Sequence, residues 1–134
     1  MDESLQTTLD ELLIEEAASV RRTVRPDANP EKGFYYRSDH FEFAKVGVPA
    51  LYADGGLEVI GMPPGHGQSQ QDRYIAQDYH QVSDEVHEGW DLSGAAADLA
   101  LLTSIGRRVA SEPHWPEWKN GSEFKARREA MLRR

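Results

Sequence analysis

A tyrosine and a histidine stand side by side at positions 79 and 80, and an aspartate follows at position 84, within the polar stretch AQDYHQVSDE. If this segment forms a helical turn, His80 and Asp84 lie on one face, and the carboxylate can hold one ring nitrogen while the other faces a metal ion. Tyr79 could then present its phenol to an oxyanion that develops beside the metal. From the spacing alone, a solvated surface histidine in a loop is the simpler interpretation, and both readings stay open.

The other histidines and paired carboxylates carry weaker signals. Asp39 and His40 stand at a predicted helix start, where a helix cap and a packed imidazole explain them as well as a site would. Glu15 and Glu16 form the kind of pair that supplies base and ligand in zinc hydrolases, but an acid-rich helix around them favours a solvated face. No HExxH, Walker, GxSxG or dinucleotide-binding motif is present. The remaining histidines have no partner pattern and are interpreted as structural or exposed: His66, His87 and His114.

The composition restricts the classes of function. The chain has 134 residues, the size of one domain, and residues 1–134 show no repeat and no internal boundary. Its 23 acidic and 15 basic residues give a net charge of −8, which disfavours a nucleic-acid partner. The absence of cysteine excludes disulfides, thiolate metal sites and cysteine nucleophiles. No apolar run approaches the roughly 20 residues of a membrane span, so no membrane partner is expected.

Apolar residues recur at helical spacing in several segments. In the first of them, one apolar face is made up of Leu5, Leu9, Leu12, Leu13, Ala17 and Val20. Pro26 lies in the loop that follows. Helix-capping residues and glycines mark the limits of later segments. The pattern predicts helices over residues 5–20, 38–47, 92–109 and 122–134.

Two short segments are predicted to be strands, and two others to be irregular. FYYR (34–37) is rich in aromatic residues, and VPALYAD (48–54) resembles a strand buried on both faces. A parallel strand of that kind needs neighbours on both sides and helices above and below it. Because no further strands are apparent, either partner chains complete the sheet or the sequence belongs to a larger domain. Glycines, prolines and glutamines predict a long loop over residues 61–78, and residues 113–121 are predicted to be irregular.

Several stretches occur in an order that resembles a known family. They are FYYRSDHFEFAKVGVPALYADGG, then DYHQVSDE, then W-DLSGAAADL, and the ending PHWPEWKNGSEFKARREAML. In this order they resemble the C-terminal part of bacterial co-catalytic di-zinc aminopeptidases, a family that includes leucyl aminopeptidase-like enzymes, glutamate carboxypeptidase and glutaminyl cyclase. The resemblance covers the chain from about Leu5 onward. It implies a peptide substrate, hydrolysis at peptide N-termini and two zinc ions in the complete site.

The resemblance also implies a fold and roles for particular residues. The implied fold is an α/β/α sandwich around a mixed, largely parallel sheet, of which this chain is the C-terminal portion. His80 matches the last zinc ligand of the family, Tyr79 matches a tyrosine that stabilises the tetrahedral intermediate, and Asp84 matches an acidic residue that supports their turn. Another matching segment borders the substrate site, which implies a supporting or specificity role for Ser38, Asp39 and His40.

The departures from the family pattern predict an incomplete site. The upstream H-x-D motif, the Glu-Glu pair and a further aspartate ligand do not appear in their family context, and Glu15-Glu16 lies in the wrong place. We therefore expect the C-terminal part of a catalytic domain, which starts at an internal or misassigned methionine or was truncated. Such a chain alone should bind zinc weakly or not at all and should be inactive.

A second hypothesis comes from a different class. The chain could stand alone as a non-catalytic folded or oligomeric remnant of a peptidase domain. In either case the apolar face of residues 92–109 is too large for this chain to cover, which predicts a homo-oligomer. Family members are often periplasmic or extracellular, and this sequence carries no export signal.

Overall fold

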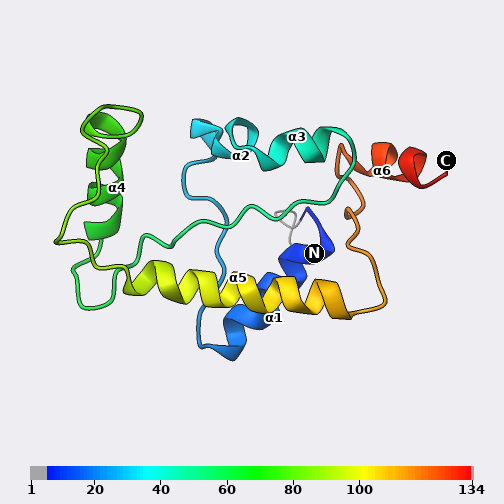
Figure 1. Ribbon diagram of the computed structural model, residues 1–134, viewed down its shortest axis with the longest axis horizontal. Helices are drawn as coiled ribbons and strands as arrows, with labels where there is room; N and C mark the ends of the chain where they lie inside the picture. The colour runs from blue at the N-terminus through cyan, green and yellow to red at the C-terminus, as the bar shows by residue number, and fades with distance from the viewer. Residues whose placement is uncertain (1–5, 134) are drawn as a thin grey trace. The chain divides into compact units, whose positions relative to one another are not determined.

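Every regular element of the described residues is a helix. The computed structural model describes residues 6–133 (Figure 1). Their contacts form two compact units: one holds the residues up to Ala53 together with those from Leu99 onward, and the other holds Asp54–Asp98. The helices are α1 (Thr8–Ser19), a short 3-10 turn (Pro30–Lys32), α2 (Phe34–Arg37), α3 (His40–Lys45), α4 (His66–Gln77), α5 (Ser93–Ser111) and α6 (Lys125–Leu132).

The predicted α/β/α sandwich with a mixed, largely parallel sheet is wrong. Residues 6–133 contain no strand, and the one backbone bridge among them pairs Thr7 with Trp118. FYYR forms the helical turn α2, at whose end the Ser38 hydroxyl donates to the Phe34 carbonyl at 2.8 Å. Residues 48–54 lie as an irregular segment. Aromatic and β-branched residues favour a strand only where a neighbour pairs with its backbone, and neither segment has such a neighbour.

The helices expected from apolar periodicity are confirmed as α1 and α5, and the two further helices expected over residues 38–47 and 122–134 are confirmed as α3 and α6. In α1, the Thr7 hydroxyl accepts from the Leu9 amide, and the Asp10 carboxylate accepts from the Thr7 amide at 2.7 Å. This capping box satisfies backbone donors that the first helical turn leaves free. Of the predicted face residues, Leu9, Leu13 and Ala17 are buried and Leu12 is half-buried, whereas Leu5 lies outside the described residues. Val20, which directly follows α1, is exposed, contrary to the prediction.

The loop predicted over residues 61–78 is wrong for most of its length, because His66–Gln77 form α4. Both prolines precede this helix, and Gly65 adopts a left-handed backbone with φ of +84° directly before it, whereas Gly67 lies in its first turn. Side chains four residues apart then support one another: Gln68 donates to Asp72 at 2.9 Å, and Arg73 donates to Gln77 at 3.3 Å. Glutamine, arginine and alanine favour helix, and this preference determines the structure of the segment that follows the two prolines.

Trp118 lies at the centre of the hydrophobic core of the first unit. It is buried with Ala44 and Phe124, and its indole nitrogen donates to the Gly47 carbonyl at 3.0 Å. The residues beside Trp118 pair with the start of α1, since the Thr8 amide donates to the Glu117 carbonyl at 2.9 Å. The irregular segment 113–121 therefore joins both ends of the chain to α3.

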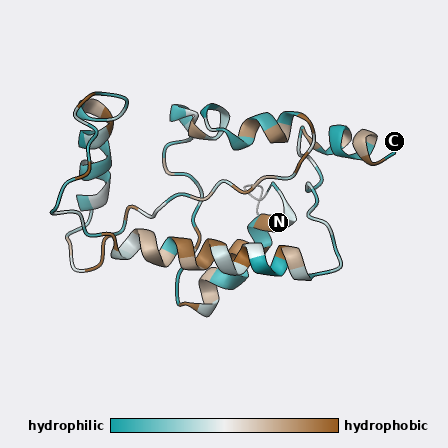
Figure 2. Ribbon diagram, in the orientation of Figure 1, coloured by the Kyte–Doolittle hydropathy of each residue, from teal (hydrophilic) through white to brown (hydrophobic). Residues whose placement is uncertain are grey.

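The apolar residues of α5 are only partly covered. Ile105 is buried, whereas Leu99 is 65% exposed and Leu102 is 40% exposed. Figure 2 shows hydrophobic residues concentrated along the middle of this helix. None of the helices in the described part of the chain has the combination of length and apolar character that crossing a membrane requires.

Gly47 is expected to be intolerant of any side chain. Its φ is +95°, and a Cβ atom there would lie 2.7 Å from the backbone nitrogen of Arg128, in the middle of α6. A left-handed backbone costs an L-residue about 1–2 kcal/mol, and the steric clash adds to that cost. We expect Gly47→Ala to lower the free energy of unfolding by more than about 2 kcal/mol in urea titrations.

Gly33→Ala is the matched control. Gly33 is also left-handed, with φ of +64°, but a Cβ atom there meets nothing within 4 Å. Gly33→Ala should therefore lower the free energy of unfolding only by the cost of the left-handed backbone, about 1 kcal/mol. Equal losses in the two variants would contradict the close approach of α6 to Gly47.

Candidate functional site

Tyr79 and His80 lie on a turn directly after α4. The turn gives His80 a left-handed backbone with φ of +62°, a conformation that non-glycine residues adopt rarely. The imidazole is stacked on the Tyr79 ring, with centroids 3.9 Å apart and an angle of 22° between the planes. His80 is exposed and Tyr79 is half-buried. The two side chains that the sequence singled out therefore form one aromatic pair that solvent reaches.

Backbone and side-chain hydrogen bonds hold this turn against the end of α4. The Tyr79 amide donates to the Tyr74 carbonyl at 2.9 Å, and the Gln81 amide donates to the Asp78 carbonyl at 2.8 Å. The Ser83 hydroxyl donates to the Gln77 carbonyl at 3.1 Å. These bonds close the turn on both sides of His80.

Asp84 is bonded to Tyr74 in this turn. The Tyr74 hydroxyl donates to the Asp84 carboxylate at 2.8 Å, and no hydrogen bond joins Asp84 to His80 among the described residues. The bond to Asp84 raises the pKa of the Tyr74 phenol above its ordinary value. The spacing of four residues would bring His80 and Asp84 onto one face only in a helix, and this segment is a turn.

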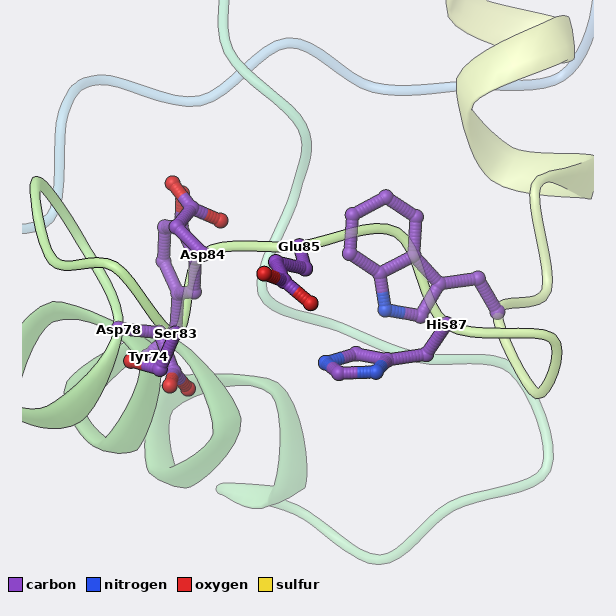
Figure 3. A pocket seen from close by; sticks show the side chains of 7 residues that line it. Tyr74, Asp78, Ser83, Asp84, Glu85 and His87 are labelled. Atoms are coloured by element: carbon purple, nitrogen blue, oxygen red, sulfur yellow. The ribbon is translucent and has the colours of Figure 1, made fainter.

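A shallow pocket of about 230 Å³ lies beside the turn (Figure 3). His87 and Trp90 stand edge to face at its rim, with ring centroids 5.9 Å apart. Figure 3 shows Glu85 between His87 and the pair formed by Tyr74 and Asp84. The residues that line the pocket are Tyr74, Asp78, Ser83, Asp84, Glu85, His87 and Trp90.

The described residues do not by themselves fit a zinc ion. Within residues 6–133 no group of three or more histidine, aspartate or glutamate side chains is placed to hold a metal. A catalytic zinc ion generally takes three protein ligands. At this turn the chain offers one exposed imidazole, His80, while the nearby carboxylate of Asp84 is already hydrogen-bonded to a phenol.

The predicted residues at positions 38–40 lie at the start of α3, in the other unit. Asp39 occupies the N-cap position, but its side chain makes no capping hydrogen bond. The His40 ring is stacked on Tyr52 with centroids 4.8 Å apart and lies edge-on to Tyr35 at 4.5 Å. Its Nε2 atom is buried without a hydrogen-bond partner, as is the Tyr35 hydroxyl. In this arrangement His40 links α3 to the segment that follows it.

Burial also sets the ionisation of this cluster. It lowers the pKa of His40 below its ordinary value, although the neighbouring Asp39 carboxylate acts in the opposite direction. It raises the pKa of Tyr35 to about 12. Both shifts favour the neutral side chain, as expected for polar groups taken out of water.

The Glu15-Glu16 pair has a structural partner. Arg108 of α5 donates to Glu15 at 2.9 Å and to Glu16 at 3.0 Å, and Ser104 also donates to Glu16. Hydrogen bonds from Ser104 and Arg108 lower the pKa of Glu16 below its ordinary value. The pair therefore ties α1 to α5.

Sequence reasoning missed Tyr74. Its hydroxyl bonds Asp84, and its ring lies 6.0 Å from the Tyr79 ring, centroid to centroid. The segment was predicted to be a loop, which gives no register between positions 74 and 79. Recognising the helix formers of residues 68–77 would have placed Tyr74 in the last turn before the Tyr-His pair.

Comparison with known proteins identifies the family. The model of peptidase family M28 matches residues 2–104. The chain belongs to this family, whose members are in general metal-dependent peptidases, and the predicted membership is confirmed. No curated protein and no solved structure matches the chain.

The ionisation of His40 predicts a loss of stability in mild acid. Its pKa is lowered from 6.5 in the folded chain, so the unfolded chain takes up the proton first as the pH falls. We expect the free energy of unfolding to decline below about pH 6.5 and to level off once the pH passes the lowered pKa. Urea titrations between pH 7.5 and 5 measure this decline.

Two variants separate His40 from the other titrating groups. His40→Phe keeps a flat ring and cannot be protonated, so it should show a shallower decline. Asp39→Asn removes the carboxylate that raises the pKa of His40, so it should deepen the decline. A decline that is the same in His40→Phe as in the parent protein would refute the assignment.

Proposed function

We propose that this chain contributes to a zinc-dependent aminopeptidase, in which His80 is one zinc ligand and Tyr79 donates to the oxyanion. The observation that carries the proposal is the exposed Tyr79-His80 pair, held on a hydrogen-bonded turn in a member of peptidase family M28. The imidazole offers a lone pair to a cation. The phenol offers a proton to an oxygen that gains negative charge as a peptide carbonyl is attacked.

The remaining parts of such a site are not supplied by the described residues. They contain no cluster that could hold a metal, and their one Glu-Glu pair, Glu15-Glu16, is bonded to Arg108. The loss of a general base alone typically costs about 10²–10⁴ in rate. Association of identical copies cannot supply the general base either, because each copy lacks the same residues.

The isolated chain is therefore expected to be inactive. With excess zinc, it should hydrolyse a leucyl anilide no faster than buffer with zinc, measured by release of the chromophore. Calorimetry should show weak zinc binding or none, since a single neutral imidazole competes poorly with water for the ion. Turnover by the chain that is lost in His80→Ala would contradict this prediction.

The gene offers a direct test of the proposed function. The reading frame upstream of Met1 should encode the H-x-D and Glu-Glu motifs that the family site requires. Protein expressed from the extended frame should then release the N-terminal residue of peptides in the presence of zinc, and His80→Ala should abolish that activity. An in-frame stop immediately upstream of Met1 would instead favour a non-catalytic folded or oligomeric remnant.

We also propose that the chain forms a homo-oligomer through the apolar face of α5. Leu99 and Leu102 of α5 are 65% and 40% exposed, and apolar surface of this kind commonly marks an interface. We expect sedimentation at micromolar concentration to show a symmetric dimer or higher oligomer. Leu99→Gln should weaken association at least about tenfold.

Leu132→Gln provides the control for the association experiment. Leu132 is 67% exposed, but it lies on α6 near the end of the chain, away from the α5 face in sequence. This variant should associate like the parent protein. A parent chain that sediments as a compact monomer would contradict the proposed interface.

A further inference from the structure

The backbone of His80 is the strained point of the turn that bears the Tyr-His pair. Residues other than glycine avoid a left-handed backbone, which costs them free energy unless the surroundings impose it. Among the described non-glycine residues, only Arg21 shares the feature, and Arg21 follows the end of α1. The left-handed backbone of His80 therefore has to be stabilised by contacts from the residues around the turn.

Tyr74 makes three contacts that could provide this stabilisation. Its carbonyl accepts from the Tyr79 amide at 2.9 Å, one residue before His80. Its ring lies 6.0 Å from the Tyr79 ring, which in turn stacks on the imidazole. Its hydroxyl donates to Asp84 at 2.8 Å, on the far side of His80. The Tyr74 side chain thus contacts the turn both before and after His80, through its ring and its hydroxyl.

We propose that Tyr74 is a positioning residue, whose hydroxyl holds Asp84 so that His80 keeps its left-handed backbone and exposed imidazole. This inference rests on the proposed function, because it assigns the place of Asp84 to the support of that site. It also revises the role expected of Asp84. In this proposal Asp84 supports the turn through its bond to Tyr74, and it does not bond the imidazole of His80. Tyr74 contacts no reacting group, so its effect on chemistry is indirect.

Hydrogen exchange of the turn amides tests whether the Tyr74–Asp84 hydrogen bond stabilises the turn, without a measurement of activity. The Gln81 and Asp84 amides are bonded within the turn, to Asp78 and Gln81, and exchange when the turn opens. Tyr74→Phe keeps the ring and removes only the hydroxyl. We expect it to speed exchange of these two amides about tenfold, while the amides of α5 keep their rates. Asp84→Ala should have the same effect, with no further increase in the double variant.

A rescue experiment tests whether the strain at residue 80 is what Tyr74 opposes. Glycine adopts the left-handed backbone without steric cost. In the Tyr74→Phe background, His80→Gly should therefore slow exchange of the turn amides roughly fivefold. Failure of Tyr74→Phe to speed exchange, or failure of His80→Gly to slow it again, would overturn the inference.

Tyr36→Phe is the matched control. The Tyr36 hydroxyl also donates to a carboxylate, that of Glu123 at 3.4 Å, but both residues belong to the other unit. This variant should leave exchange of the turn amides unchanged. If the extended protein is inactive while the exchange results are as expected, the proposed peptidase function fails and the positioning role of Tyr74 stands.

Discussion

The packing of Trp118 is the constraint on which the first unit depends. This side chain is 2% exposed, and its indole N–H reaches the Gly47 carbonyl across a buried contact. An indole placed there without an acceptor would leave a polar group unsatisfied in the core. The turn after α3 must therefore direct the Gly47 carbonyl toward the indole. Because α6 passes too close to position 47 for any side chain, this position requires glycine.

The same residue determines how the ends of the chain are held. Trp118 pairs with Thr7 in a single bridge, and Thr7 is fully buried where it caps α1. The direction of α1 is thus fixed at its first turn by a segment that has no regular structure. Toward the other end of α1, Arg108 bonds both Glu15 and Glu16, and these ion pairs join α1 to α5. Such partly exposed ion pairs orient helices more than they stabilise them.

The sequence predicted the helices of this chain better than its architecture. Apolar spacing located α1 and α5 because that spacing reflects burial, and Leu13 and Ile105 are indeed buried. The expected sheet failed because strand preference in FYYR and VPALYAD depends on a partner strand, which local sequence cannot supply. Family resemblance predicted the membership that the family model confirms, but it did not predict this helical arrangement.

The candidate site was predicted in its residue types and only partly in its geometry. Tyr79 and His80 were singled out as neighbours in sequence, and they are stacked in the structure. The link between Asp84 and Tyr74 was not predicted, because it requires knowing that α4 ends at Gln77. A left-handed backbone at a histidine cannot be read from composition either, since glycine or asparagine would be the usual signal there.

The discontinuity of the first unit has a consequence for biosynthesis. The hydrogen bond between Glu117 and Thr8 spans 109 residues of sequence, so α1 must leave the ribosome long before its bridging partner exists. All contacts within Asp54–Asp98, by contrast, can form while later residues are still being added. Long-range contacts delay folding, and domains generally fold as units while the chain emerges. The first turn of α1 therefore lacks this partner until residue 117 has been synthesised, although the bonds that join α1 to Ser104 and Arg108 can form earlier.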